Sequence, residues 1–145
     1  MKTYKFLIPV LFFAFSCHSS NTSGKDPVVD GVISMDSLKS EVLFLHDEVM
    51  PKMGALRRVR KDLLLQADSI VSVDSARAEE LKALASNIGD ASEGMMQWMR
   101  AYEPDFEGTD EEIRAYFEAQ KDAIQKVKNQ MENTLAMGQA ALGND

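Results

Sequence analysis

The chain is poor in the residues that build disulfide frameworks and nucleic-acid interfaces. It has one cysteine among 145 residues, so neither an internal disulfide nor a multi-cysteine metal site can form. Basic residues are outnumbered: 16 lysines and arginines stand against 23 aspartates and glutamates, for a formal net charge of −7. Because phosphate binding needs a surplus of lysine and arginine, this balance argues against nucleic acid as a partner.

Sequence motifs that carry catalysis or nucleotide binding are also missing. The chain has no Walker loop, GxGxxG, HExxH, GxSxG or CxxC motif. Carboxylates are abundant, but neighbours such as Asp47 and Glu48 point to different faces of a helix, and no Ser-His-Asp or Cys-His arrangement can be assembled. The sequence therefore predicts a protein that is not an enzyme. Its composition, 45% hydrophobic and 27% charged residues, is typical of a single globular domain.

The first apolar stretch is too short to cross a membrane. Residues 6–15 carry no charge and follow two basic residues, Lys2 and Lys5. A membrane-spanning helix needs about 20 apolar residues, whereas a run of this length after a basic start is typical of a signal peptide. We therefore expect residues 1–16 to be a signal peptide.

The apolar run ends in the sequence AFSC, residues 14–17, which resembles a bacterial lipobox. Small residues occupy the third and first positions before Cys17, the only cysteine of the chain. The resemblance implies lipidation of Cys17 and a membrane anchor. Ala14, where leucine is common, and bulky Phe15 depart from the usual pattern, and an ordinary secretory signal is the alternative. Several acyl chains on one cysteine would anchor the protein stably.

The residues after Cys17 predict a tether. Residues 17–34 are rich in serine and also contain asparagine, glycine and proline, and they show no helical periodicity. We interpret them as a flexible linker between the lipid and a folded domain over residues 35–145. His18, rather than aspartate, follows the cysteine. By resemblance to known sorting patterns, this favours the outer membrane, with the domain facing the periplasm or the cell surface.

Three series of apolar residues, spaced three and four apart, run along the rest of the chain. Such spacing places each series on one face of a helix, and no strand alternation competes with it. The series are Leu38, Val42, Leu45, Val49, Leu56, Val59, Leu63 and Ile70; Leu81, Leu84, Ile88, Ala91, Met95, Trp98 and Tyr102; and Ile113, Phe117, Ile124, Val127, Met131, Leu135 and Leu142. Each stripe must be buried by another helix, and short connections make neighbouring helices antiparallel. The predicted fold is an all-α, up-down-up antiparallel three-helix bundle of coiled-coil character.

Polar residues suited to helix capping precede each series. They are Asp36 or Ser37, Asp74 or Ser75, and a capping box of Thr109 and Glu112. The connections are expected near residues 69–73 and 103–108. Pro51 falls inside the first series, where it removes a backbone N–H and predicts a bend. Gly54 and Gly89 are expected to face each other and to let their helices approach closely.

One run of basic residues, Arg57, Arg58, Arg60 and Lys61, lies on the first helix. We expect a solvated face that pairs with acids such as Glu79 and Glu80 across the hairpin. A patch for the phosphates of acidic lipids is the alternative.

Two segments resemble a group of small bacterial lipoproteins. The run HDEVMPKMG at residues 46–54 and the run EGMMQWM at residues 93–99 look like the group often labelled "viral A-type inclusion protein". The resemblance implies a helical, lipid-anchored protein of the cell envelope and brings no catalytic residues. The expected partners are the membrane, through Cys17, and another protein or a second copy of the chain.

The same two segments are rich in methionine, and the helical hairpin predicts that they meet. If the first connection centres near residue 72, residues equidistant from it face each other, so His46 lies opposite residue 98. Thioether sulfur and neutral imidazole suit Cu(I), and a tryptophan ring can lie over a cation. The candidate ligands are His46, Met50, Met53, Met95, Met96 and Met99, with Trp98 as a possible cluster partner.

Two other interpretations of this cluster remain open at the level of sequence. Methionine is a flexible core filler that packs well against aromatic rings, so the cluster can be core alone, with His46 at its rim. Haem held between His46 and Met95 or Met99 is the third interpretation, although three helices leave little room for the macrocycle. The sequence therefore predicts a chain without a cofactor, with Cu(I) as the alternative.

Overall fold

The computed structural model describes residues 34–143, and all of the regular structure in this range is helical. The elements are α1 (Met35–Val49), the 3-10 turn η1 (Met50–Lys52), α2 (Met53–Ile70), α3 (Ser75–Ala101) and α4 (Asp110–Gly143). The predicted all-helical bundle is thus confirmed. The predictions for the signal peptide, for Cys17 and for the tether up to residue 33 lie outside the described residues.

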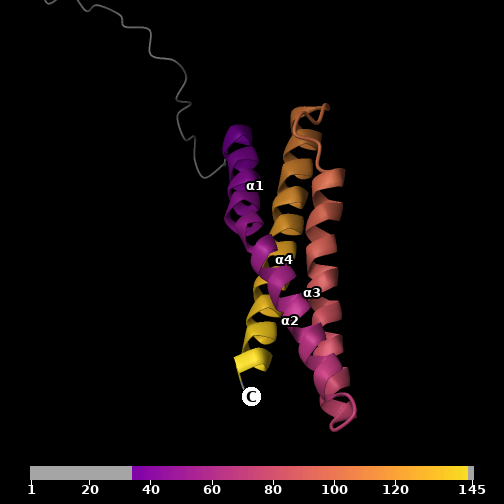
Figure 1. Ribbon diagram of the computed structural model, residues 1–145. Helices are drawn as coiled ribbons and strands as arrows, with labels where there is room; N and C mark the ends of the chain where they lie inside the picture. Colours follow the sequence, from indigo (N-terminus) through magenta and orange to yellow (C-terminus); the bar gives the residue numbers. More distant parts are fainter. Residues whose placement is uncertain (1–33, 144–145) are drawn as a thin grey trace, which may run out of the picture.

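The first helical segment bends at Pro51. Met50 still donates its backbone N–H to the His46 carbonyl, but proline has no N–H to continue the α-helical pattern. The chain passes through η1 before α2 begins, and the axes of α1 and α2 differ in direction on its two sides (Figure 1). The bend expected at Pro51 is therefore present as a 3-10 turn.

Three helical segments pack against one another. The first consists of α1 and α2 together, the second is α3, and the third is α4. In Figure 1, α4 lies between α1 and α3 in the upper half, while α2 passes in front of α4 and runs beside α3 in the lower half. One consequence is that α1 and α2 have different neighbours, because α1 packs mainly on α4 and α2 mainly on α3.

A single apolar core joins all of these segments. Most members of the three predicted stripes are buried or packed against it, and the described residues include no buried polar or charged residue. The core also contains four alanines that the stripes omit, namely Ala67, Ala78, Ala85 and Ala141. Small side chains at these positions let the helices approach closely. Every helix therefore depends on the others for burial of its apolar face.

Two of the three predicted helix starts are confirmed. The Asp74 side chain accepts from the Arg77 N–H at 2.9 Å. Thr109 and Glu112 form a reciprocal capping box, in which the Glu112 N–H donates to Thr109 Oγ1 at 3.3 Å and the Thr109 N–H donates to Glu112 Oε2 at 2.8 Å. This backbone hydrogen bond is the main reason that the pKa of Glu112 lies below its ordinary value.

The first helix starts earlier than Asp36 or Ser37, the caps expected from the sequence. Ser34 is its N-cap, and the Ser34 hydroxyl accepts from the Ser37 N–H at 3.2 Å. The expectation rested on the first apolar residue of the stripe, Leu38. The helix begins two or three residues nearer the N-terminus because a serine suited to capping is available there.

The expected close approach of Gly54 and Gly89 was wrong. A methyl group at Gly54 would meet only the Arg58 side chain of its own helix, and one at Gly89 would meet Arg60. The long Arg60 side chain fills the space beside Gly89 and donates to the Ala85 carbonyl at 3.2 Å. The close approach is instead at Gly138 of α4, which is buried against α2 and α3.

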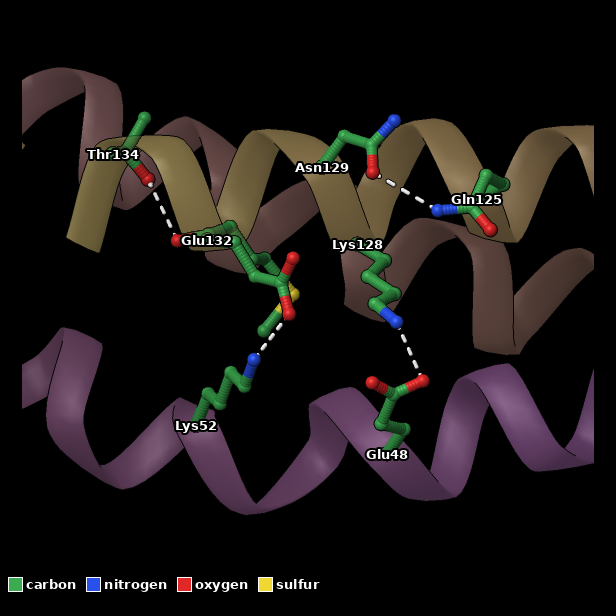
Figure 2. Close-up of polar contacts among 8 residues, drawn as sticks. Glu48, Lys52, Gln125, Lys128, Asn129, Glu132 and Thr134 are labelled. Carbon is green, nitrogen blue, oxygen red and sulfur yellow. Dashed lines mark hydrogen bonds and ion pairs between the residues drawn. The ribbon is translucent and has the colours of Figure 1, made fainter. Parts of the chain in front are cut away.

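Ion pairs connect α1 and η1 to α4. Glu41 pairs with Lys121, Glu48 with Lys128, and Lys52 with Glu132. Figure 2 shows the second and third pairs, which bridge the two helical segments side by side. Lys52, which interrupts the first apolar stripe, is thus half-buried and paired rather than merely solvated. In the part of the chain described here, no helix has both the length and the apolar character needed to cross a membrane.

Candidate functional site

The six candidate ligands are distributed over α1, η1, α2 and α3. Met95 is fully buried, and Met50 and Met53 are partly buried against the core. Met96 and Met99 are exposed to nearly the same degree, 38% and 37%. Successive residues of a helix point about 100° apart, so Met96 faces away from Met95, whereas Met99, four residues after Met95, lies on nearly the same side of α3 as Met95.

A cavity of about 200 Å³ opens between α1 and α3. We call it the aromatic pocket. It is lined by Leu43 and His46 of α1 and by Trp98, Met99 and Tyr102 of α3. The expected position of His46 opposite residue 98 is confirmed, because the rings of His46 and Trp98 have centroids 5.8 Å apart.

A second cavity, of about 480 Å³, lies between α2 and α3. Its lining includes Met53 and Met96 together with charged side chains of both helices. His46 and Met99 therefore share one cavity, whereas Met53 and Met96 share another. The structure does not bring the six candidate ligands to one point.

The imidazole of His46 is oriented by the residue that follows it. Its Nδ1 lies 2.9 Å from Asp47 Oδ1. An ionised carboxylate can only accept a hydrogen bond, so Nδ1 carries the proton. In neutral imidazole this leaves the lone pair on Nε2.

A series of aromatic rings extends from His46 across this end of the bundle. Consecutive rings have centroids between 4.2 and 6.5 Å apart, including a stacked Trp98–Tyr102 pair at 4.9 Å. In order, the rings belong to His46, Trp98, Tyr102, Phe117, Tyr116 and Phe106. The aromatic pocket is therefore one end of a larger cluster that also fixes the α3–α4 connection, where the Glu103 N–H donates to the Tyr116 hydroxyl at 2.6 Å.

Two polar atoms in the walls of the aromatic pocket are buried without a partner. They are Trp98 Nε1 and the Tyr102 hydroxyl. Burial is also the main cause of a raised pKa at Tyr102, with further contributions from Tyr116 and Asp105. Unpaired donors of this kind destabilise a fold, so their presence in one small region marks it as unusual.

The basic run does not pair across the hairpin with the acids that we expected. Glu79 pairs with Lys82 and Glu80 with Arg77, each within α3. These acids lie in the first turns of α3, where a basic residue three positions away on the same helix is nearer than any on α2. Arg57 and Arg60 instead line the cavity between α2 and α3.

Leu43 and Tyr102 are pocket residues that our sequence interpretation did not include. Tyr102 was recognised only as the end of an apolar stripe, although its position four residues after Trp98 already placed the two rings on one helix face. Leu43 gave no signal, because it lies outside the stripe of α1. A metal site of three or more His, Cys, Asp or Glu side chains does not occur within residues 34–143.

Comparison with known proteins brings no further information. No family model, curated protein or solved structure matches this chain.

Proposed function

We propose that this chain is a non-catalytic lipoprotein of the bacterial cell envelope, anchored through Cys17, whose helical bundle acts by contact with another protein. The observation that carries the proposal is the exposure of Phe44. This phenylalanine is 67% exposed in the middle of α1, next to Leu43 at 41%. Large aromatic side chains are enriched at protein interfaces, and burial of Phe44 by a partner would remove most of this apolar area from water.

The proposed topology is the up-down-up bundle expected from the stripes. Two observations support it. The ion pairs of Glu48 with Lys128 and of Lys52 with Glu132 both join residues 80 positions apart, and a constant difference in number is expected of parallel neighbours such as the first and third helices. Between α1–α2 and α3 the numbers run in opposite directions, because His46 contacts Trp98 whereas Arg60 contacts Ala85.

The proposed anchor rests on the N-terminal sequence. A basic start, a short apolar run and a cysteine at residue 17 are the elements of a lipoprotein signal. Residues 18–33 would separate the lipid from the helix cap at Ser34, with the domain facing the periplasm or the exterior from the outer membrane.

The contact is tested by a photo-crosslinking amino acid placed at position 44 in cells. We expect one discrete crosslinked product, either at twice the mass of the chain, which identifies a second copy, or at the combined mass of the chain and one other protein. The same amino acid at Glu118, an exposed position of α4, is the control and should give none. Equal, diffuse labelling from both positions would contradict the proposal.

The anchor is tested by labelling cells with a clickable palmitate analogue. The wild-type chain should be labelled and sediment with the membranes, and Cys17→Ser should lose the label. A label that persists in Cys17→Ser, or an unlabelled wild-type chain, would rule out this anchor.

A further inference from the structure

The aromatic pocket has a nitrogen ligand that is already oriented for a metal. Asp47 holds the Nδ1–H of His46 at 2.9 Å, and His46 lines the cavity. Metal-binding histidines commonly donate their second ring nitrogen to a carboxylate, which fixes the tautomer and raises the basicity of the ligating nitrogen. His46 and Asp47 have this arrangement before any metal is considered.

Met99 adds a soft ligand on the opposite wall. It belongs to α3, whereas His46 belongs to α1, so the two side chains enter the pocket from different helices. Met99 is 37% exposed, which means that core packing does not fully account for its position. A thioether is a poor ligand for hard cations and selects for Cu(I).

Trp98 and the size of the cavity restrict what can bind. The Trp98 ring lies beside His46 at 5.8 Å and lines the same pocket, where its face can stabilise a cation. The volume of about 200 Å³ is below the range of about 300–1,000 Å³ usual for small-molecule sites. An ion fits these constraints better than an organic ligand.

We propose that the aromatic pocket binds a single Cu(I) ion through His46 Nε2 and the Met99 sulfur, with Trp98 beside the ion and Asp47 as a positioning residue. The site excludes Met53 and Met96, which line the other cavity, and Met95, which is fully buried. This proposal is independent of a protein contact at Phe44, so either can fail without the other.

The experiment uses the full chain with Cys17→Ser, purified in detergent, so that the thiol cannot compete for copper. Cu(I), supplied in a reducing buffer as its bicinchoninate complex, is titrated while the fluorescence of Trp98, the only tryptophan, is followed. We expect transfer of one copper per chain with quenching of Trp98. Ag(I) should act in the same way, and Zn(II) should not quench.

The variants separate the pocket from the other methionines. His46→Ala and Met99→Leu should each weaken Cu(I) binding at least tenfold, whereas Met96→Leu should leave it unchanged. Met96 is a matched control, since it lies on the same helix and has nearly the same exposure. Circular dichroism checks the fold of each variant, and His46→Gln replaces His46→Ala if the latter unfolds.

Asp47 has its own test. Asp47→Ala should weaken Cu(I) binding about tenfold to a hundredfold, as loss of a carboxylate behind a metal-bound histidine does, while Asp47→Asn, which can still accept from Nδ1, should restore most of the affinity. The proposal is overturned if Cu(I) does not leave the competing chelator. It is equally overturned if Met96→Leu weakens binding as much as Met99→Leu, or if His46→Ala binds as the parent chain does.

Discussion

Of the glycines in the bundle, Gly138 has the least room for a side chain. A Cβ atom there would lie 2.6 Å from Val59 Cγ1 and 2.8 Å from Ile88 Cδ1. Both neighbours are β-branched core residues, and a fully packed interior offers them little room to move. The absence of a side chain at this position is what allows α4 to pack against α2 and α3 together.

We therefore expect Gly138→Ala to destabilise the protein by about 1–3 kcal/mol, the usual effect of overpacking a core. This loss should outweigh the gain in helix propensity. Gly54→Ala is the control, because its Cβ would meet only Arg58 at 3.6 Å, and we expect it to stabilise the protein by about 0.5–1 kcal/mol. Urea denaturation measures both. Two variants that change stability in the same direction would show that Gly138 is not sterically constrained.

Part of the candidate site could be predicted from the sequence. The equal spacing of His46 and Trp98 from the first connection identified their contact, because a helical hairpin fixes which residues are level. The height of a residue along the hairpin does not determine which way its side chain points. Met95, Met96 and Met99 lie at the same end of α3 but point into the core, toward α2 and toward α1, respectively, and the sequence did not reveal how α1 and α2 would divide the surface of α3.

At the scale of the element, the start of α4 depends on one carboxylate. Glu112 accepts from the Thr109 N–H, and this hydrogen bond is the main cause of its lowered pKa. A carboxyl group with a lowered pKa in the folded state stabilises the fold above its ordinary pKa of 4.5. This contribution is lost as the pH falls through the lowered value.

We expect Glu112→Ala to be less stable than the wild type at pH 7 and to approach it in stability below about pH 4. The measurement is a series of urea denaturation curves between pH 7 and pH 3. Glu111→Ala, at an exposed residue of the same turn, controls for the loss of a negative charge near the helix N-terminus. A difference between wild type and Glu112→Ala that stays constant over this range would exclude the capping role.

The ion pairs between α1 and α4 favour one alignment of these two helices along each other. Lys128 is the most buried partner, with a side-chain exposure of 14%, and it meets Glu48. Surface ion pairs contribute little, about 0.2–1 kcal/mol each. Their greater effect is on alignment, because a shift of four residues in one direction would bring Glu48 level with Glu132, and in the other Lys52 level with Lys128.

Reversal of one partner tests this alignment. Glu48→Lys should lower the free energy of unfolding by about 1 kcal/mol, because a partly buried ion pair becomes a repulsion, and the double variant Glu48→Lys with Lys128→Glu should recover most of it. Glu118→Lys, at an exposed position of α4, controls for the change in net charge. If the double variant loses as much stability as Glu48→Lys and Lys128→Glu lose when their separate effects are added, Glu48 and Lys128 are not coupled.

At the scale of the whole molecule, one continuous core contains residues of every α-helix. No half of the bundle has a separate apolar interior. The all-helical fold could be predicted because apolar periodicity extends over most of the chain. The contributions of Ala67, Ala85 and Gly138 could not, since small residues give little periodic signal and their effect depends on which helix lies opposite.

A shared core predicts cooperative unfolding. We expect the fluorescence of Trp98 and circular dichroism at 222 nm to report one coincident transition in urea, with a slope of about 1–3 kcal/mol per molar. Trp98 samples the half of the bundle that contains α1, whereas circular dichroism samples all helices. An earlier transition at Trp98 would show that the contact between α1 and α3 opens before the rest unfolds.

The two ends of the molecule differ in what they can reach. The start of α1 lies at the same end as the α3–α4 connection, to which Lys39 is joined through Asp105 at 3.2 Å, and the α2–α3 turn is at the opposite end (Figure 1). If the chain is anchored through Cys17 as we propose, the length of the bundle adds to the reach of the residues before α1. The 27 residues of α3 measure about 40 Å. Val73, 83% exposed in the α2–α3 turn, therefore lies about that far from the α3–α4 connection and would be the apolar side chain that such an anchored chain carries farthest from its first helix.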